Sequence, residues 1–414
     1  MPLKVLHITY TTSGGAGIAV LRLHKALLEQ GIESKVLVGQ TNIVSDDIVK
    51  ATETVRGRYK VPNIPVLDKI IRALRRKGKC MTPMEKMEFE LAKLDRKYPA
   101  YFDLPLSSFE LEKHPLTAWA DVINIHWISG YVDFPTFFAN VKKPVVWTMH
   151  DLNPMYGGFH HVRLREKYYN QYESLEKESY NVKKKALAGF SNLTLIALSS
   201  EMERLMKEHE FYKERQIFKI HNCVEPSVSP IVEKAALRNM LEWPVDKKIL
   251  LFVNKNMNDS EKGLSELLES LDMMDSDNIM LACVGDGYVP CSKKQIDVRH
   301  YRSVSDAIWL KLLYSAADFL VQPSHQEAFP LTPIEALCCG TPVIITPVSG
   351  AKDMINEDNG VVTSGYTPVD ISEAIKLAFG RRYDSERIRS CAIENYSPQH
   401  VAKQYIDVYQ HVLS

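Results

Sequence analysis

The stretch Ser324–Thr346, SHQEAFPLTPIEALCCGTPVIIT, decides the fold of this chain. The residues just before it, Asp318–Gln322 (DFLVQ), are apolar and β-favouring, which predicts a buried parallel strand. A short helix is expected over Pro333–Cys339, and Pro342–Thr346 predicts a second buried strand. The stretch therefore indicates a strand–loop–helix–strand unit of an α/β protein.

The start of this helix carries the chemistry. Thr332 is a suitable N-cap, Pro333 suits the first helical position, and Glu335 lies three residues after the cap. Backbone N–H groups at a helix start can hold an anion, and the carboxylates of Glu327 and Glu335 can accept hydrogen bonds from hydroxyls. A ligand with a phosphate and vicinal hydroxyls, such as a nucleotide sugar, fits this unit. The alternatives are that Glu335 only caps its helix and that Glu327 is a solvated loop residue.

Length and composition narrow the class of protein. A chain of 414 residues predicts two or three domains. The formal net charge is zero, so no overall field favours a nucleic-acid partner. The seven cysteines are scattered and odd in number, which favours a reducing compartment over a disulfide framework.

Targeting signals are not evident. The N-terminal residues MPLKVLHITY predict a strand and lack the features of a signal peptide, and no run of about 18 apolar residues is present. A cytoplasmic location is therefore expected. The segment Val66–Lys79 combines a short apolar stripe with a basic side, which predicts either peripheral contact with an anionic membrane face or packing on its own domain.

The N-terminal region predicts a Rossmann-like start. A strand over Leu3–Tyr10, the glycine loop Thr11–Gly17, a helix over Ile18–Gln30 and a strand over Lys35–Val38 follow one another. The glycines read G-G-x-G rather than G-x-G-x-x-G, and no acidic residue follows the second strand, which disfavours a dinucleotide site. A tight turn that binds nothing is the other interpretation.

Two further buried strands, Asp121–His126 and Pro144–Met149, lead to histidines. His150 follows the second of them, at the strand end where α/β proteins bind ligands. A purely structural histidine is the alternative. The spacing of His150, His160 and His161 matches no metal-ligand pattern, so no metal site is predicted.

The middle of the chain predicts a domain change. A helix over about residues 163–188 is highly charged and is expected to be largely solvated. The segment His221–Pro230 has two prolines and no periodicity, as is typical of a linker. After it the α/β pattern restarts, and the loop Asn254–Gly263 follows a buried strand. Lys255 and Lys262 on this loop could neutralise a diphosphate, or could be two exposed lysines.

These motifs resemble the retaining GT-B glycosyltransferases of family 4. The resemblance rests on SGGAGIAVLRLHKALLEQG, WTMHDLNPMYGG and HQEAFPLTPIEALCCGTPVI, and the last contains the family's E-x7-E motif. It covers nearly the whole chain except about residues 41–118. ADVINIHWISG and VVWTMHD resemble a subgroup associated with surface polysaccharide assembly.

The resemblance implies a role for each matching position. By this resemblance, Glu335 would bind the ribose hydroxyls, Glu327 would face the donor hexose, and His150 would lie near the transferred sugar. The remaining implied donor contacts are Gly15, Gly17, Lys255, Lys262, Phe329, Pro330 and Leu331. Lys255 stands where the family usually has arginine, and Phe159–His160–His161 replaces the cysteines of the subgroup.

The expected fold is thus α/β of GT-B type, with two Rossmann-like domains whose parallel sheets face each other across a cleft. The expected domains are residues 1–220 with about 397–414, including an insertion at about 41–118, and residues 221–396. The expected function is hexosyl transfer from a nucleoside diphosphate sugar, UDP-linked, to a saccharide or lipid-linked saccharide, with retention and without metal or cofactor. The alternatives are a non-catalytic nucleotide-sugar-binding protein and a GT-B nucleotide-sugar epimerase.

Overall fold

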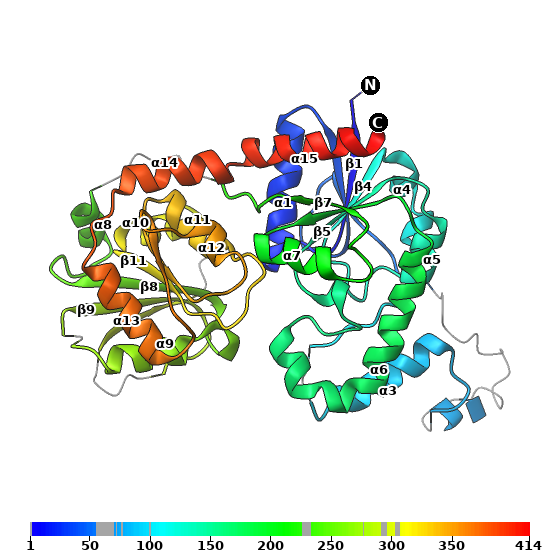
Figure 1. Ribbon diagram of the computed structural model, residues 1–414, viewed down its shortest axis with the longest axis horizontal. Coiled ribbons are helices and arrows are strands. Elements are labelled where there is room, and N and C mark those ends of the chain that lie inside the picture. The colour runs from blue at the N-terminus through cyan, green and yellow to red at the C-terminus, as the bar shows by residue number, and fades with distance from the viewer. Residues whose placement is uncertain are drawn as a thin grey trace. The chain divides into compact units, whose positions relative to one another are not determined.

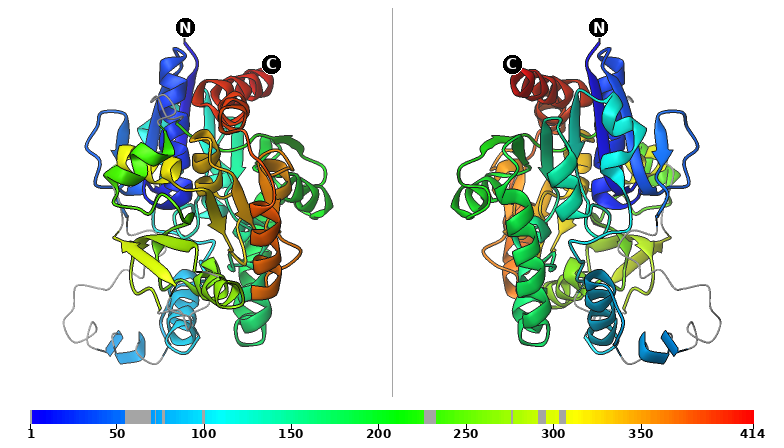
Figure 2. Two further views of the ribbon diagram at one scale, coloured as in Figure 1. Left: turned by 90° about the vertical axis from the view of Figure 1, so that its left-hand side faces the viewer. Right: turned by 90° about the vertical axis from the view of Figure 1, so that its right-hand side faces the viewer.

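The computed structural model describes residues 2–54, 70–71, 73–75, 78–98, 101–225, 233–275, 277–290, 296–302 and 307–414. The chain forms two compact units. The first comprises Met1–Ala197, Glu203–Lys219 and Gln404–Ser414, and the second comprises Leu198–Met202 and Ile220–Lys403. Each unit is built on a parallel sheet with helices packed against it (Figures 1 and 2). The prediction of two Rossmann-like α/β domains is therefore confirmed.

The sheet of the first unit has seven strands in the order β3-β2-β1-β4-β5-β6-β7, and every neighbouring pair is parallel. The chain order reverses between β1 and β4, and ligands of such sheets bind beyond the carboxyl ends of the strands at this switch point. The strands are β1 Lys4–Thr11, β2 Glu33–Gln40, β3 Ile48–Lys50, β4 Val122–Ile125, β5 Val145–Met149, β6 Leu193–Ala197 and β7 Gln216–Lys219.

The first helix begins earlier than the sequence predicted. It starts at Gly14 rather than Ile18, so the expected glycine loop forms its first turn. Val20 on this helix packs against Val36 and Val38 of β2. The helices of this part of the chain are α1 Gly14–Glu29, α3 Pro83–Asp95, α4 Pro115–Trp119, α5 Phe134–Asn140, α6 Val162–Ala188, α7 Ser200–Glu208 and α15 Pro398–Leu413, with short 3-10 turns η1 Leu111–Lys113 and η2 Asn153–Met155.

The segment at about residues 41–118 adds to the first unit. Its strand β3 extends the sheet beside β2, and α3 lies beside α6 (Figures 1 and 2). Tyr172 of α6 donates a hydrogen bond to Asp95 Oδ1 at 2.7 Å. The basic segment Val66–Lys79 falls largely outside the described residues, although Arg75 forms an ion pair with Glu85 of α3.

The sheet of the second unit has six parallel strands in the order β10-β9-β8-β11-β12-β13. Its switch point lies between β8 and β11. The strands are β8 Lys248–Asn256, β9 Ile279–Asp286, β10 Asp297–Tyr301, β11 Phe319–Gln322, β12 Val343–Ile345 and β13 Gly360–Val362.

Alternate residues of β8 serve opposite faces of this sheet, as the strand period requires. Ile249 and Leu251 pack with α8, α10, α11 and α14, whereas Leu250 and Phe252 pack with α9 and α13. The helices are α8 Lys234–Met240, α9 Leu264–Asp272, α10 Ala307–Ala316, α11 Leu331–Cys338, α12 Ala351–Met354, α13 Pro368–Phe379 and α14 Ser385–Tyr396, and η3 Ser260–Lys262 precedes α9.

The first residues of the expected linker are packed rather than free. Val224 is buried, and its N–H donates to Tyr396 O at 2.9 Å. Within the described ranges, no helix combines the length and the apolar character needed to cross a membrane.

Candidate functional site

An ion pair occupies the switch point of the second unit. Lys262 lies in the loop after β8, Glu327 lies in the loop after β11, and Lys262 Nζ is 2.6 Å from Glu327 Oε1. Their side chains are 25% and 15% exposed. Burial disfavours the charge of Lys262, but the carboxylate of Glu327 raises its pKa above the ordinary value. The pair thus places a fixed ammonium at the sheet edge where ligands bind.

The carboxylate of Glu327 is held on one side only. Ser324 Oγ donates to Oε1 at 2.9 Å, and Gln322 Nε2 does so at 3.4 Å. Together with Lys262, three donors meet at Oε1. Oε2 accepts no hydrogen bond from the described residues, so it can accept one from a ligand hydroxyl.

The two loops are locked together beneath this pair. A Cβ on Gly263, which has φ 73°, would lie 2.0 Å from Pro323 O. His325 N donates to Glu261 O at 2.8 Å, and His325 Nε2 is 2.8 Å from Glu266 Oε1. This close backbone approach positions Lys262 relative to Glu327.

The expected capping box at Thr332 and Glu335 is wrong. The helix α11 begins at Leu331 with Pro330 as its N-cap, and no side chain caps it. The hydroxyl of Thr332 donates to Gln322 Oε1 at 2.8 Å and is therefore not a cap. Glu335 Oε2 instead accepts a hydrogen bond from Tyr314 at 3.0 Å. Glu335 is thus positioned from α10, and the N–H groups at the start of α11 have no side-chain cap.

The other predicted donor contacts differ in their surroundings. Phe329 is 5% exposed and stacks on His221 with ring centroids 4.7 Å apart, so only its backbone is suited to a ligand. Lys255 is exposed and lies on β8. Its side chain makes no hydrogen bond or ion pair with the residues that the structure describes, and it takes no part in the ion pair between Lys262 and Glu327.

In the first unit, three neighbouring strands, β1, β4 and β5, bring three histidines together. His7 lies on β1, while His126 and His150 directly follow β4 and β5. His7 Nδ1 is 2.9 Å from His126 Nε2, and His126 Nδ1 is 3.1 Å from His150 Nε2. His150 was predicted as a site residue from its place after a buried strand, whereas His7 lies within an apolar strand and carries no such signal.

The glycines of the first helical turn are not equivalent. A Cβ on Gly17 would lie 2.5 Å from the carbonyl carbon of Thr12, whereas one on Gly15 would meet nothing within 4 Å. Packing within the unit therefore accounts for Gly17. It does not account for Gly15, whose predicted donor contact stays a prediction.

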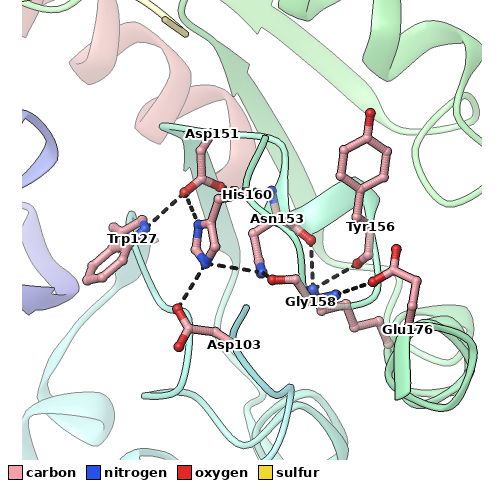
Figure 3. A network of polar contacts seen from close by, with 9 residues as sticks. Asp103, Trp127, Asp151, Asn153, Tyr156, Gly158, His160 and Glu176 are labelled. Atoms are coloured by element: carbon pink, nitrogen blue, oxygen red, sulfur yellow. Dashed lines mark hydrogen bonds and ion pairs between the residues drawn. The ribbon is translucent and has the colours of Figure 1, made fainter. Parts of the chain in front are cut away.

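A polar network fixes the loop after His150 (Figure 3). His160 is fully buried, with Nδ1 2.6 Å from Asp151 Oδ2 and Nε2 2.9 Å from Asp103 Oδ2. Trp127 Nε1 also donates to Asp151 Oδ2, at 2.9 Å. Burial would lower the pKa of His160, but the two carboxylates raise it to about 9. Asp103, from the inserted segment, thus helps to hold the loop beside His150.

Two charged side chains of α6, Glu176 and Lys183, are buried and hold the same loop, although most of this helix is exposed or half-buried, as predicted. Lys183 Nζ donates to Asn153 O, Asn153 Oδ1 and Tyr156 O at 2.6, 2.9 and 2.9 Å. Glu176 accepts from the N–H groups of Gly157 and Gly158 at 3.0 and 2.8 Å. Figure 3 shows the contact with Gly158. Both charges are buried because loop backbone groups satisfy them.

We expect His160→Gln to change how stability depends on pH. Because the folded pKa of His160 is about 9 against an ordinary 6.5, its stabilisation is complete below pH 6.5 and is lost as the pH rises toward 9. The difference in unfolding free energy between wild type and variant should shrink by about 3 kcal/mol across this range. Urea unfolding at each pH measures it.

Groups that titrate in both proteins cancel in the difference between the unfolding free energies of wild type and His160→Gln. Burial lowers the pKa of Lys183 to about 7, so this lysine also titrates in the window, but it does so in both proteins. Parallel pH profiles for wild type and His160→Gln would show that the carboxylates do not hold a charged imidazole.

Comparisons with known proteins agree with this geometry. Residues 233–394, which lie within the second unit, match the family model described as Glycosyl transferases group 1. The match includes both switch-point loops. The protein is a glycosyltransferase with two parallel-sheet Rossmann-like domains.

Individual relatives extend the similarity to the whole chain. D-inositol 3-phosphate glycosyltransferase of Xylanimonas cellulosilytica is 24% identical over 429 residues, covering 96% of this chain and 91% of that protein. Sucrose-phosphate synthase from Thermosynechococcus elongatus has the same fold, with a TM-score of 0.67, 18% identity and 99% of each chain covered. Anabaena Alr3699/HepE, solved with UDP and glucose, has a TM-score of 0.62 and 15% identity, covering 99% of this chain and 100% of that chain.

Proposed function

We propose that the protein transfers a hexosyl group from a nucleoside diphosphate sugar, UDP-linked, to a saccharide or lipid-linked saccharide, with retention and without a metal. The observation that carries the proposal is the Lys262–Glu327 pair at the switch point of the second unit, with Glu335 on the adjoining helix. This arrangement offers a cation for a diphosphate and carboxylates for sugar hydroxyls. Structures of HepE with UDP or UDP-glucose support the choice of donor.

The leaving diphosphate is the group that needs stabilisation in this reaction. An ammonium has three donors, and one of those on Lys262 is used by Glu327, which leaves two for phosphate oxygens. Lys255 and the uncapped N–H groups at Leu331 and Thr332 supply further positive potential. Fixed donors of this kind stabilise developing negative charge without reorganisation.

The sugar and ribose contacts follow from the two carboxylates. Oε2 of Glu327 accepts from a hexose hydroxyl, and Glu335, held by Tyr314, accepts from the ribose hydroxyls. The backbone of Phe329–Leu331 lies next to the donor. In this proposal the first unit contributes His150, Gly15 and Gly17, as the family resemblance implies.

Release of nucleoside diphosphate across a panel of nucleotide sugars, with and without saccharide acceptors, tests the proposal. We expect release from at least one donor, with a UDP-sugar the most active. Binding of a donor without release under any condition would favour a nucleotide-sugar-binding protein. Conversion of the donor to its epimer would favour the epimerase, and no binding at all would reject the enzyme.

Glu335→Ala should weaken nucleoside diphosphate binding by about 1–3 kcal/mol, because a charged acceptor of the ribose hydroxyls is lost. Titration calorimetry with UDP measures this. Glu373→Ala, on an exposed position of α13, is the matched control and should bind UDP as wild type does. Equal affinities for wild type and Glu335→Ala would remove Glu335 from the nucleotide site.

A lipid-linked acceptor would bring the protein to the cytoplasmic face of a membrane, and the basic segment Val66–Lys79 is the proposed contact. Flotation with anionic liposomes tests this contact. Neutralising Arg72 and Arg76 should reduce the floated fraction. Arg75 is less suitable because it already pairs with Glu85. Flotation that does not change on neutralisation would leave the segment with a packing role only.

A further inference from the structure

Three imidazoles, two of them buried, form a hydrogen-bonded chain that ends at His150. His7 and His126 are 0% and 3% exposed, and His150 is half-buried. The two links join His7 Nδ1 to His126 Nε2 and His126 Nδ1 to His150 Nε2, at 2.9 and 3.1 Å. Nδ1 of His150 has no partner among the described residues. His150 is therefore the only end of the chain from which a ring nitrogen can reach a ligand.

All three rings are neutral near pH 7. Burial lowers the pKa of His7 well below its ordinary value, and the neighbouring His24 lowers it further. Burial and the adjoining histidines do the same for His126. Burial lowers the pKa of His150 to about 4, against an opposing effect of Asp151. Each ring thus carries one N–H and one lone pair.

Neutral rings linked in this way have only two proton arrangements that make both hydrogen bonds. In the first, every ring is protonated on Nδ1, so His7 donates to His126 and His126 donates to His150. In the second, every ring is protonated on Nε2 and both bonds run the other way. The tautomer of His150 is thereby tied to that of His7.

The surroundings of His7, at the inner end of the histidine chain, decide between the two proton arrangements. Nε2 of His7 is buried and has no hydrogen-bond partner among the described residues. The nearest other imidazole, His24, lies edge-on at 6.3 Å between ring centroids, and its Nδ1 bonds to Ser34 Oγ. The second arrangement would leave an orphaned N–H at His7, whereas the first leaves only a lone pair. A buried N–H without a partner is the rarer and costlier of the two.

We propose that His7 and His126 are positioning residues that hold His150 in the Nδ1–H tautomer, so that it offers an N–H donor to a substrate. The consequence for turnover rests on the proposed glycosyl transfer, in which His150 lies near the transferred sugar. An N–H at that point donates to a sugar hydroxyl oxygen. The tautomer itself is a property of the free protein.

Nitrogen NMR of the full chain with ring-labelled histidine tests the proton arrangement. Single replacements of His7, His126 and His150 assign the signals. We expect all three residues to show a protonated Nδ1 and an unprotonated Nε2 in the free protein near pH 7. A protonated Nε2 on His150, or a mixture of both forms, would overturn the proposal whether or not any donor is turned over.

The positioning role is tested by His126→Phe. His150 should then show both tautomers, and kcat with the most active donor should fall on the order of tenfold while the donor KM stays near the wild-type value. His126→Asn, whose amide can donate from the place of Nδ1, should restore the single tautomer and part of kcat. The control His24→Phe, at another buried histidine, should leave both readouts unchanged.

Two results separate a positioning role from a merely structural one. Equal loss of kcat in His126→Phe and His126→Asn, with the His150 tautomer unchanged, would contradict the proposal. If no donor is turned over by wild type, the proposed function fails, but the NMR result still decides the proton arrangement.

Discussion

Lys262→Met is expected to lower kcat by about 100- to 1,000-fold, the usual cost of removing one preorganised donor to developing charge. The ammonium lies 2.6 Å from Glu327 at the switch-point edge, where the proposal places the leaving diphosphate. Its loss also leaves Glu327 without its cation, so donor binding should weaken as well. Steady-state release of nucleoside diphosphate measures the effect.

Lys247→Met is the matched control for this change. Lys247 is also a partly buried lysine of the second unit, and its ion pair with Asp297 spans 3.2 Å. It lies before β8, at the opposite end of that strand from Lys262. We expect near wild-type turnover from this variant. Similar losses in both variants would point to general destabilisation rather than to a role in the reaction.

Gly263→Ala is expected to destabilise the second unit by about 2–5 kcal/mol. The residue has φ 73°, which costs a side chain about 1–2 kcal/mol, and the new Cβ would lie 2.0 Å from Pro323 O. Because the obstacle is backbone, the loop must shift, which adds about 1–3 kcal/mol. The shift displaces Lys262, so turnover should also fall on the order of 100-fold. Thermal unfolding and nucleoside diphosphate release measure the two effects.

Gly31→Ala is the control that separates the cost of a positive φ from the cost of the steric clash at Gly263. Gly31 has a similar φ of 79°, but a Cβ there would meet nothing within 4 Å. It should therefore cost about 1–2 kcal/mol and leave turnover unchanged. If the two alanine variants are equally stable, the close approach of the two loops does not position Lys262.

Much of the fold could be predicted from local sequence. Buried parallel strands are continuous apolar runs, so the bounds of β5, β11 and β12 were each predicted to within one residue. The E-x7-E stretch also placed Glu327 and Glu335 on the correct loop and helix. These features depend on neighbours in the sequence, which a local pattern records.

The errors arose where a distant residue decides the local structure. Thr332 looks like an N-cap, but its hydroxyl bonds to Gln322, and the helix begins at Leu331. Glu176 and Lys183 look like surface charges of a solvated helix, but the loop at residues 153–158 buries and satisfies them. Hydrophobic periodicity and secondary-structure propensity are local features of the sequence, so they contain no information about partners that are distant in the sequence.

The histidine chain could not be found for the same reason. His7 and His126 are separated by 119 residues and meet because β1 and β4 are neighbours in the sheet. An isolated histidine in an apolar strand carries no signal of this. Strand order had to be known before the chain His7–His126–His150 could be recognised.

Hydrogen exchange of the protein with and without UDP tests the central claim most directly. The claim is that the second unit holds the nucleotide through the loops after β8 and β11. We predict that UDP slows exchange at residues 254–263 and 324–335, and that Lys262→Met reduces this protection. Tight binding of UDP without protection of these two segments would contradict the account.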